Sequence, residues 1–561
     1  MRLRPFVAPD EPEQNPAQWH RILTLLATIS LFIGTRDTWT SAASHQLAIA
    51  AVITLCYASI LVSGVLTLVV RRSRSLARLD LVVLVTAVTL AYCTLAVKHD
   101  FSDESILTTQ AARALLHGHP VYGQSWPWLW GPGIAYTPTV TGGYDFTYGY
   151  PPLTALLTAP LLWIGHAALP ENLVTTTAIV LGAVVMWKML PTPWRSAATL
   201  VCLGLGLVPA YARLGYPAVV ALAFLIPVVV RWTRMGAGGP ADWARAACLG
   251  AACAAQQLPW FLAPFLLAGV YALRRGELGA RGAAAAVGRI VAIAAGTWLL
   301  INAYFIVSEP RNWISGIVLP LTQGAVLHGQ GLVGISLYYT DGSDRLSWYA
   351  HAGMLLAAGL LVLFVLFVRR LGPAATVLPW CAFFLSTRSQ DGYYLLMTPL
   401  WLAAAVTVPP TAFTTAWQPR LLHGRRTARA VLAAAVVAPS LVAVAVAATG
   451  RPPLHMRAAA DSRTPLTIRT LRVQVRNGGD ATLDPHFILT TGQGVSRWWK
   501  VLEGPATIPG HTTASYRIQA PDGSFVLPKP GVRIRLRAFS SSPMTLSSQD
   551  IHLDREPVPG H

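Results

Sequence analysis

Residues 46–70 read QLAIAAVITLCYASILVSGVLTLVV, without one charged side chain, and residues 71–78 follow as RRSRSLAR. A helix needs about 20 apolar residues to cross the roughly 30 Å of a bilayer's hydrocarbon core. The run is long enough for one crossing, and the arginines that follow it belong at a membrane surface. This stretch therefore predicts a membrane-spanning helix.

Similar apolar stretches recur along most of the chain. They lie at about 22–40, 46–70, 80–97, 151–168, 173–190, 196–210, 216–231, 246–273, 287–307, 347–368, 372–386, 394–410 and 428–449. Several are short for a crossing, so we expect about 11–13 transmembrane helices. Pro209, Gly215 and Pro217 predict a broken hairpin, and a second interruption is expected at Gln256–Pro259.

Composition supports a membrane protein and divides the chain. Of 561 residues, 53% are hydrophobic and 12% charged, whereas soluble globular chains carry about 25% charged residues. Residues 450–561 are about twice as rich in charge as residues 1–449. We therefore predict a transmembrane domain at 1–449 and a soluble-type domain at 450–561.

The net charge of +19 is concentrated in short clusters beside the apolar stretches. The clusters are Arg71, Arg72, Arg74 and Arg78; Arg231, Arg234 and Arg245; Arg274, Arg275 and Arg281; Arg369 and Arg370; and Arg420, Arg425, Arg426 and Arg429. This placement is typical of the positive-inside rule rather than of a nucleic-acid-binding surface.

The clusters predict an orientation in the plasma membrane. With the clusters and the N-terminus in the cytoplasm, the loops 98–150, 308–346 and 386–393 and the C-terminal domain lie outside. The alternation does not close between Glu171 and Arg231, and the topology of 151–285 stays open. The first twenty residues are polar and Pro-rich, so we expect no cleavable signal. All six cysteines fall in or beside apolar stretches, so no disulfide framework is expected.

The C-terminal domain has the pattern of a β-sandwich. Alternating segments such as TLRVQVR at 470–476 and VRIRLRAF at 532–539 are separated by residues that favour turns. Trp498 and Trp499 are adjacent on an expected strand, where their side chains would point to opposite faces. One would then be available to bind a glycan. Two partly buried structural tryptophans are the alternative.

The loop 98–150 is the segment richest in chemistry. Asp100, Asp103 and Glu104 follow an apolar stretch directly, and an amphipathic helix is expected at about 106–116, ended by Gly118. A carboxylate beside a hydrophobic wall can accept a proton from a hydroxyl nucleophile. The alternative is that Asp103 and Glu104 only cap the helix.

A family resemblance rests on several motifs in order. They are Asp103-Glu104 with AARALLHG at 111–118 and PVY at 120–122; YGYPPL at 148–153; QQLPWFLAPF at 256–265; the loop from Asn312 to HGQG at 328–331; and FLSTRSQDGY at 384–393. Together they resemble the GT-C membrane glycosyltransferases, in particular the GT87-like, polyprenyl-phosphate-mannose-dependent mannosyltransferases of actinobacteria. The resemblance covers roughly residues 80–410.

The resemblance implies an enzyme that moves a sugar, usually with inversion, from a polyprenyl-phosphate donor to a hydroxyl of a cell-envelope glycan or glycolipid outside the cell. A first-loop Asp would act as general base: Asp103, with Asp100 or Glu104 as neighbours that tune or replace it. Spacing to Gly118 favours Glu104 instead, and the choice among the three stays open.

A departing lipid phosphate needs a fixed cation, and a guanidinium can hold it bidentately. Arg388 is the leading residue for this role, and an Arg that contacts lipid headgroups is its alternative. The other residues expected to bind donor phosphate or substrate are Arg213, Tyr150, Gln257, His328, Asp391 and Tyr393. His99, His117 and His119 join the acids in the first loop, but no spacing is diagnostic of a metal. We expect no cofactor, while a divalent cation stays open.

Two other functions remain alternatives. An arabinofuranosyltransferase that uses decaprenyl-phosphate-arabinose would share the fold. A transporter or flippase of lipid-linked sugars would suit the broken helices and the polar Gln256 and Gln257. Such a transporter typically has internal repeats and polar groups near the midplane. The sequence has no evident repeat, and its acids lie at a membrane boundary.

Overall fold

The structure is a computed structural model, and it describes residues 16–130, 137–165, 170–420, 426–464, 466–529 and 531–551. The chain forms two compact units. Unit 1 comprises Met1–Val121, Tyr150–Ser308 and Leu395–Trp417, and unit 2 comprises Tyr122–Gly149, Glu309–Tyr394 and Gln418–His561. The polar N-terminal residues 1–15, which we expect in the cytoplasm, and Arg425 of the last basic cluster lie outside the described residues.

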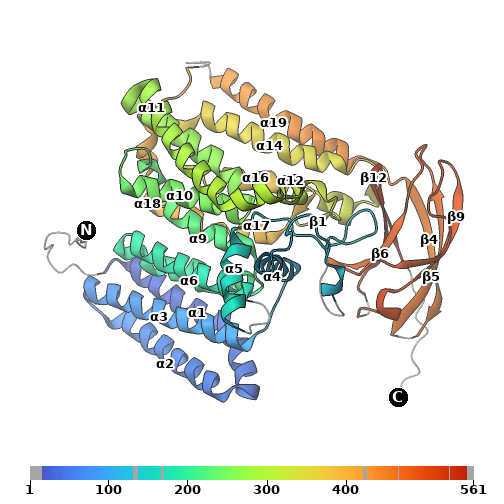
Figure 1. The fold of residues 1–561 in the computed structure, drawn as a ribbon, viewed down its shortest axis with the longest axis horizontal. Helices are drawn as coiled ribbons and strands as arrows, with labels where there is room; N and C mark the ends of the chain where they lie inside the picture. Colours follow the sequence, from blue (N-terminus) through green and yellow to red (C-terminus); the bar gives the residue numbers. More distant parts are fainter. Residues whose placement is uncertain are drawn as a thin grey trace. The chain divides into compact units, whose positions relative to one another are not determined.

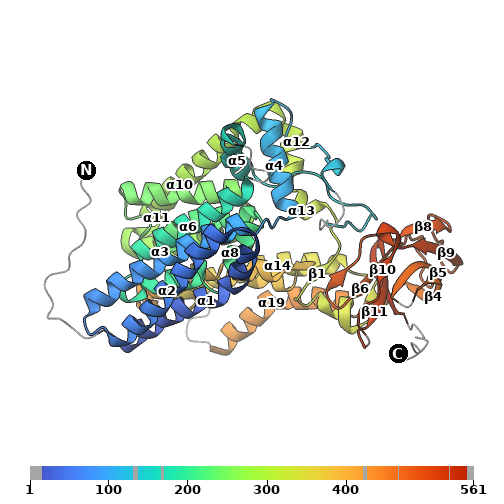
Figure 2. The same cartoon turned by 90° about the horizontal axis from the view of Figure 1, so that it is seen from below.

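Unit 1 is helical. Its main helices are α1 (Gln18–His45), α2 (Leu47–Val69), α3 (Ser73–Val97), α4 (Asp103–Leu116), α5 (Leu153–Ile164), α6 (Glu171–Met189), α7 (Arg195–Leu203), α8 (Leu207–Arg213), α9 (Pro217–Val229), α10 (Pro240–Ala255), α11 (Leu258–Ser308) and α18 (Thr398–Thr407). The helices α1, α2 and α3 lie side by side (Figures 1 and 2). Helix α11 has a non-helical break at Gly279.

Unit 2 combines helices, irregular segments and strands. Its main helices are α12 (Pro310–Ile317), α13 (Leu319–Thr322), α14 (Ser347–Leu366), α15 (Val368–Leu371), α16 (Leu378–Cys381), α17 (Asp391–Leu395, whose last residue belongs to unit 1) and α19 (Arg426–Ala448), with a π-helix, η4 (Ile335–Tyr339). Its strands are β1 (His328–Gly329), β2 (Gly342–Ser343), β3 (Arg388–Ser389), β4 (Leu454–Arg463), β5 (Thr467–Asn477), β6 (His486–Thr491), β7 (Gly494–Val495), β8 (Lys500–Glu503), β9 (Thr513–Gln519), β10 (Phe525–Val526), β11 (Ile534–Ser541) and β12 (Met544–Asp550).

The helices confirm a helical membrane protein but give fewer full-length spans than expected. In the described chain, six helices are long and apolar enough to cross a membrane: α2, α3, α6, α11, α14 and α19. The segments Thr192–Leu203 and Leu207–Arg213, bent by 49°, make a seventh if they are counted as one span. Other apolar stretches form shorter helices such as α5 and α9. The expected 11–13 spans are therefore not reached.

Both expected interruptions are present. Helix α8 ends at Arg213 and α9 begins at Pro217, so the helix is interrupted at Gly215, where a broken hairpin was expected. Helix α10 ends at Ala255 and α11 begins at Leu258. The side-chain Oε1 of Gln256 accepts a hydrogen bond from the backbone N–H of Leu258 at 2.7 Å. Gln256 thus satisfies a donor that the new helix start leaves without an intrahelical partner.

The C-terminal strands form two five-stranded sheets. One has the order β10-β5-β9-β8 with β4 also paired to β5, and the other has the order β2-β12-β11-β6-β7. Inner residues of both sheets, such as Val473, Ile518, Leu489 and Leu536, share one buried core. The tail is therefore β-rich as predicted, with its sheets packed face to face (Figure 2). The strand β2 comes from the segment 308–346, which the sequence pattern presents only as a loop.

Strand β11 is buried on both faces. Ile534, Leu536 and Ala538 point into the sandwich core. On the other face, Phe539 joins a second buried cluster with Leu327, Leu337 and Leu385 of the same unit. The arginines that alternate along β11 are therefore covered by protein, although an alternating Arg/apolar strand usually has its polar face in water.

Candidate functional site

Two of the acidic residues of the first loop, Asp103 and Glu104, lie in the capped first turn of a helix in unit 1. Ser102 Oγ accepts a hydrogen bond from the N–H of Ser105 at 3.2 Å, and Ser105 Oγ accepts one from the N–H of Ser102 at 3.0 Å. This reciprocal cap fixes the first turn of α4, which holds Asp103 and Glu104. Ser102, and not Asp103 or Glu104, is the capping residue. Both carboxylates lie where the helix dipole favours negative charge.

Asp100 precedes α4, and residues of two other helices of unit 1 contact it. Arg213, at the end of α8, donates its Nε–H to Oδ2 of Asp100 at 3.4 Å. The backbone carbonyl of Asp100 accepts a hydrogen bond from the side-chain amide of Asn172, on α6, at 2.5 Å. Arg213, which we expected to bind phosphate, is therefore the ion-pair partner of one of the candidate acids.

A fourth carboxylate, Glu171, lies beside this helix start. Its side chain is fully buried, and Oε2 accepts a hydrogen bond from Thr158 at 2.5 Å. Within the described chain, Oε1 has no hydrogen-bond partner. Glu171 also interacts electrostatically with Glu104. Sequence reasoning did not single out Glu171, although an acid at the start of an apolar stretch was a visible signal.

Gly215 allows these segments to meet. Its φ of +75° is in the left-handed region, and an added Cβ would lie 2.4 Å from Cβ of Ser105 and 2.8 Å from Oδ1 of Asn172. A side chain would separate the turn after α8 from the starts of α4 and α6. Ser102 reinforces the contact by donating its hydroxyl to the carbonyl of Leu214 at 2.7 Å.

Two other expected substrate residues of unit 1 lie on irregular segments. Tyr150 precedes α5, and Gln257 lies in the turn between α10 and α11. Both side chains are half-buried.

In unit 2 the structure brings His328 and Arg388 together. The strands β1 and β3 run parallel, with His328 opposite Arg388 and Gly329 opposite Ser389. The N–H of Gln330 donates to the carbonyl of Ser389 at 2.8 Å, which continues the ladder. Gly329 has a φ of +127°, and an added Cβ would lie 2.3 Å from the carbonyl oxygen of Ser389. The pairing therefore depends on glycine at this position.

Asp391 and Tyr393 follow on α17. Asp391 interacts electrostatically with His328, and the ring of Tyr393 packs 5.1 Å from that of Phe383. Burial lowers the pKa of His328 below its ordinary 6.5, and the neighbouring Arg388 and Arg537 lower it further, while Asp391 opposes them. His328 is consequently neutral at pH 7.

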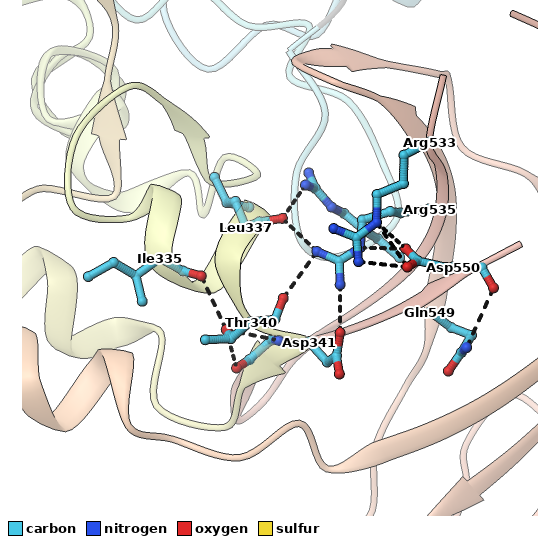
Figure 3. A network of polar contacts seen from close by, with 10 residues as sticks. Ile335, Leu337, Thr340, Asp341, Arg533, Arg535, Gln549 and Asp550 are labelled. Carbon is cyan, nitrogen blue, oxygen red and sulfur yellow. Dashed lines mark hydrogen bonds and ion pairs between the residues drawn. The ribbon is translucent and has the colours of Figure 1, made fainter. Parts of the chain in front are cut away.

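Strand β11 contributes Arg535 and Arg537 on one face, and Arg533 lies directly before the strand. Arg535 donates to the carbonyls of Leu337 and Thr340 at 3.3 and 3.0 Å and to Asp341 at 2.6 Å. Arg533 and Arg535 both pair with Asp550, as Figure 3 shows. Arg537 donates to the carbonyl of Leu337 at 2.5 Å. Sequence reasoning missed these residues, although arginine at every second position from 533 to 537 was a visible signal.

The two tryptophans require a correction. Trp498 and Trp499 lie in the connection between β7 and β8 and not on a strand. Trp499 is 3% exposed and belongs to the sandwich core. Trp498 is half-buried; its Nε1–H donates to the carbonyl of Gly143 at 2.9 Å, and its backbone N–H donates to the hydroxyl of Tyr144 at 2.8 Å. The expected strand placement is therefore wrong, and the glycan-binding role of these residues stays a prediction.

Among the described residues, no group of three or more His, Cys, Asp or Glu side chains is arranged to hold a metal ion. Comparisons with protein-family models, curated proteins and solved structures found no match for the chain. The resemblance to GT-C glycosyltransferases therefore rests on its sequence motifs, and the activity that it implies is a proposal.

Proposed function

We propose that the protein is an integral-membrane glycosyltransferase. It transfers a sugar, with mannose as the leading choice, from a polyprenyl-phosphate donor to a hydroxyl of a cell-envelope glycan or glycolipid, with inversion. The observation that carries the proposal is the position of Asp103 and Glu104 in the capped first turn of α4. The apolar helix α3 ends only a few residues before this turn, at Val97.

The proposed chemistry needs one base and one cation. The acceptor hydroxyl attacks the anomeric carbon of the sugar, and the bond from that carbon to the phosphate oxygen breaks. The polyprenyl phosphate leaves with the electron pair, and Asp103 takes the hydroxyl proton. Glu104 is the alternative base. Asp100, which is engaged with Arg213, positions the turn.

The cation proposed from the sequence is Arg388. Arg388 is held on the β1–β3 ladder beside His328, with Asp391 on the following helix. A guanidinium in this setting can hold a phosphate through two parallel hydrogen bonds and stabilise the charge that develops on departure.

The test is a transfer assay with purified protein in nanodiscs, radiolabelled polyprenyl-phosphate-mannose and an envelope lipid extract. We expect Asp103→Asn to lower the rate by about 10²–10⁴-fold. Asp480→Asn is the matched control, because this carboxylate is 99% exposed in the β-rich domain.

The other variants and donors decide between the alternatives. A full loss in Glu104→Gln with activity retained in Asp103→Asn would move the base to Glu104. Transfer only from the corresponding arabinose donor would identify an arabinofuranosyltransferase. No transfer from either donor by the unmodified protein would refute the proposed enzyme and leave transport as the function to test.

A further inference from the structure

Arg537 is a buried cation of unit 2. It is among the largest side chains that are almost fully excluded from solvent, on the face of β11 that points away from the sandwich core. One nitrogen donates to the carbonyl of Leu337, and the guanidinium lies 5.1 Å from the centre of the Tyr338 ring. In the described chain, its Nε has no hydrogen-bond acceptor.

No described carboxylate forms an ion pair with Arg537. Its neighbours on the same face differ, because Arg533 pairs with Asp550, and Arg535 with both Asp341 and Asp550. Burial lowers the pKa of Arg537 to about 10, so the side chain stays charged at pH 7. A buried charge is costly unless it has a partner of opposite sign. Among the described residues, Tyr338 favours the charged form of Arg537, but no carboxylate forms an ion pair with it.

The surroundings of Arg537 are cationic as well. Phe539, two residues along the same face of β11, packs in one cluster with Leu327 and Leu385, which flank the β1–β3 ladder. His328 on this ladder interacts with both Arg388 and Arg537, and of the acids only Asp391 opposes these charges appreciably. Two guanidiniums thus lie close enough to one imidazole, that of His328, to interact with it electrostatically.

We propose that Arg537, with Arg388 and His328, forms an anion site that binds a phosphate group. A phosphate has enough oxygens to accept hydrogen bonds from two guanidiniums and an imidazole together, and the planar fork of arginine matches its geometry. The site would give the C-terminal β-rich domain a direct part in ligand binding. It deepens the proposed function, and it rests on that function only for the lipid that carries the phosphate.

Phosphate binding is measured on the full chain in nanodiscs of neutral lipid. The probes are polyprenyl phosphate, inorganic phosphate and phosphatidylglycerol, and polyprenol without phosphate is the neutral control. We expect Arg537→Gln to weaken binding of at least one phosphate probe by about tenfold or more. Arg533→Gln, directly before the same strand but exposed and paired with Asp550, should change it by no more than about twofold.

A second variant covers the case in which Arg537→Gln does not fold. Arg537→Lys keeps the positive charge but loses the planar guanidinium that can donate two parallel hydrogen bonds. We therefore expect this variant to fold and to bind phosphate with intermediate affinity. The responding probe identifies the source of the phosphate, whether a polyprenyl carrier, a bulk lipid headgroup or the free ion. Unchanged affinity for all phosphate probes in both variants would overturn the site, and so would an equal loss of polyprenol binding.

The outcome is separate from that of the transfer assay. Phosphate binding that depends on Arg537, in a protein that transfers no sugar, would keep the site and refute the enzyme. Sugar transfer with phosphate binding that ignores Arg537 would keep the enzyme and refute the site.

Discussion

Arg213 and Asp100 form an ion pair across 3.4 Å, which joins the end of α8 to the segment before α4. The Arg213 side chain is 10% exposed and that of Asp100 is 42% exposed. The guanidinium is therefore nearly buried, and its partner reaches solvent. Replacement of Asp100 alone leaves the buried Arg213 guanidinium without its carboxylate partner, whereas replacement of both residues does not.

A double-mutant cycle tests this asymmetry. We expect Asp100→Asn and Arg213→Met each to lower the thermal unfolding midpoint, with a coupling of about 1 kcal/mol because one partner is half-exposed. The double variant should be more stable than the sum of the single effects predicts. Additivity to within about 0.3 kcal/mol would show that the contact contributes nothing.

Substitution of Gly215 tests the convergence of α4, α6 and α8. Gly215→Ala adds a steric conflict with Ser105 to the strain of a positive φ. We expect a loss of about 2–5 kcal/mol of stability, from about 1–2 of strain and about 1–3 of overpacking. Gly238→Ala is the matched control, because its φ is +94° and an added Cβ meets nothing within 4 Å. Equal losses in the two variants, measured by chemical denaturation, would contradict this packing.

Substitution of Trp498 tests whether this residue is structural. Trp498→Ala removes the hydrogen bond to Gly143 and the edge contact with Phe539. We expect a loss of about 1–3 kcal/mol and faster proteolysis within 137–149. Trp499→Ala should cost about 3–5 kcal/mol, because it empties a core position. Unchanged stability of both variants, together with weaker glycan binding, would support the glycan-binding role instead.

The pH dependence of stability tests the environment of His328. The folded pKa lies below the ordinary 6.5 because of burial and two arginines. As pH falls below about 6.5, the unfolded chain takes up this proton before the folded one does, so stability decreases in acid. Above that pH the contribution is fully present.

His328→Gln should therefore flatten the decline of the unfolding midpoint between about pH 7 and 5. His511→Gln, an exposed histidine of the same unit, is the control. A slope that stays the same in His328→Gln would contradict the buried, cationic surroundings assigned to this residue. Burial also lowers the pKa of His486, so part of the slope should remain in either variant.

The helical membrane class, the β-rich tail and the interruption at Gln256 could all be predicted, because each follows from local composition and periodicity. The span count could not, since hydropathy does not separate a full helix from short ones such as α5 and α9. The pairing of His328 with Arg388 joins residues 60 positions apart, and the contact of Asp100 with Arg213 spans 113. Such long-range pairs depend on tertiary packing, which periodicity does not encode.

Trp498 and the β11 arginines illustrate the same limit. A strand with alternating polar and apolar residues is expected to expose its polar face to solvent. That expectation fails where another segment of the chain covers the polar face. Arg535 contacts η4, almost 200 residues earlier in the chain. Nothing within β11 itself indicates this cover. The arginine spacing was visible, but its meaning depended on what lies opposite.

The strand β2 has a practical consequence for anyone who wishes to produce the tail alone. It pairs with β12 through Leu546–Ser343 and Ser547–Gly342, so a fragment cut at 449/450 would have a bare sheet edge there. The same cut would expose Ile488, Phe539 and Leu546, which form an apolar surface patch when α14, α19 and η4 are absent. Unpaired sheet edges and exposed apolar patches commonly promote aggregation. A fragment for expression trials should keep Tyr122–Gly149 and Glu309–Tyr394 together with Gln418–His561, because these three segments form one compact unit.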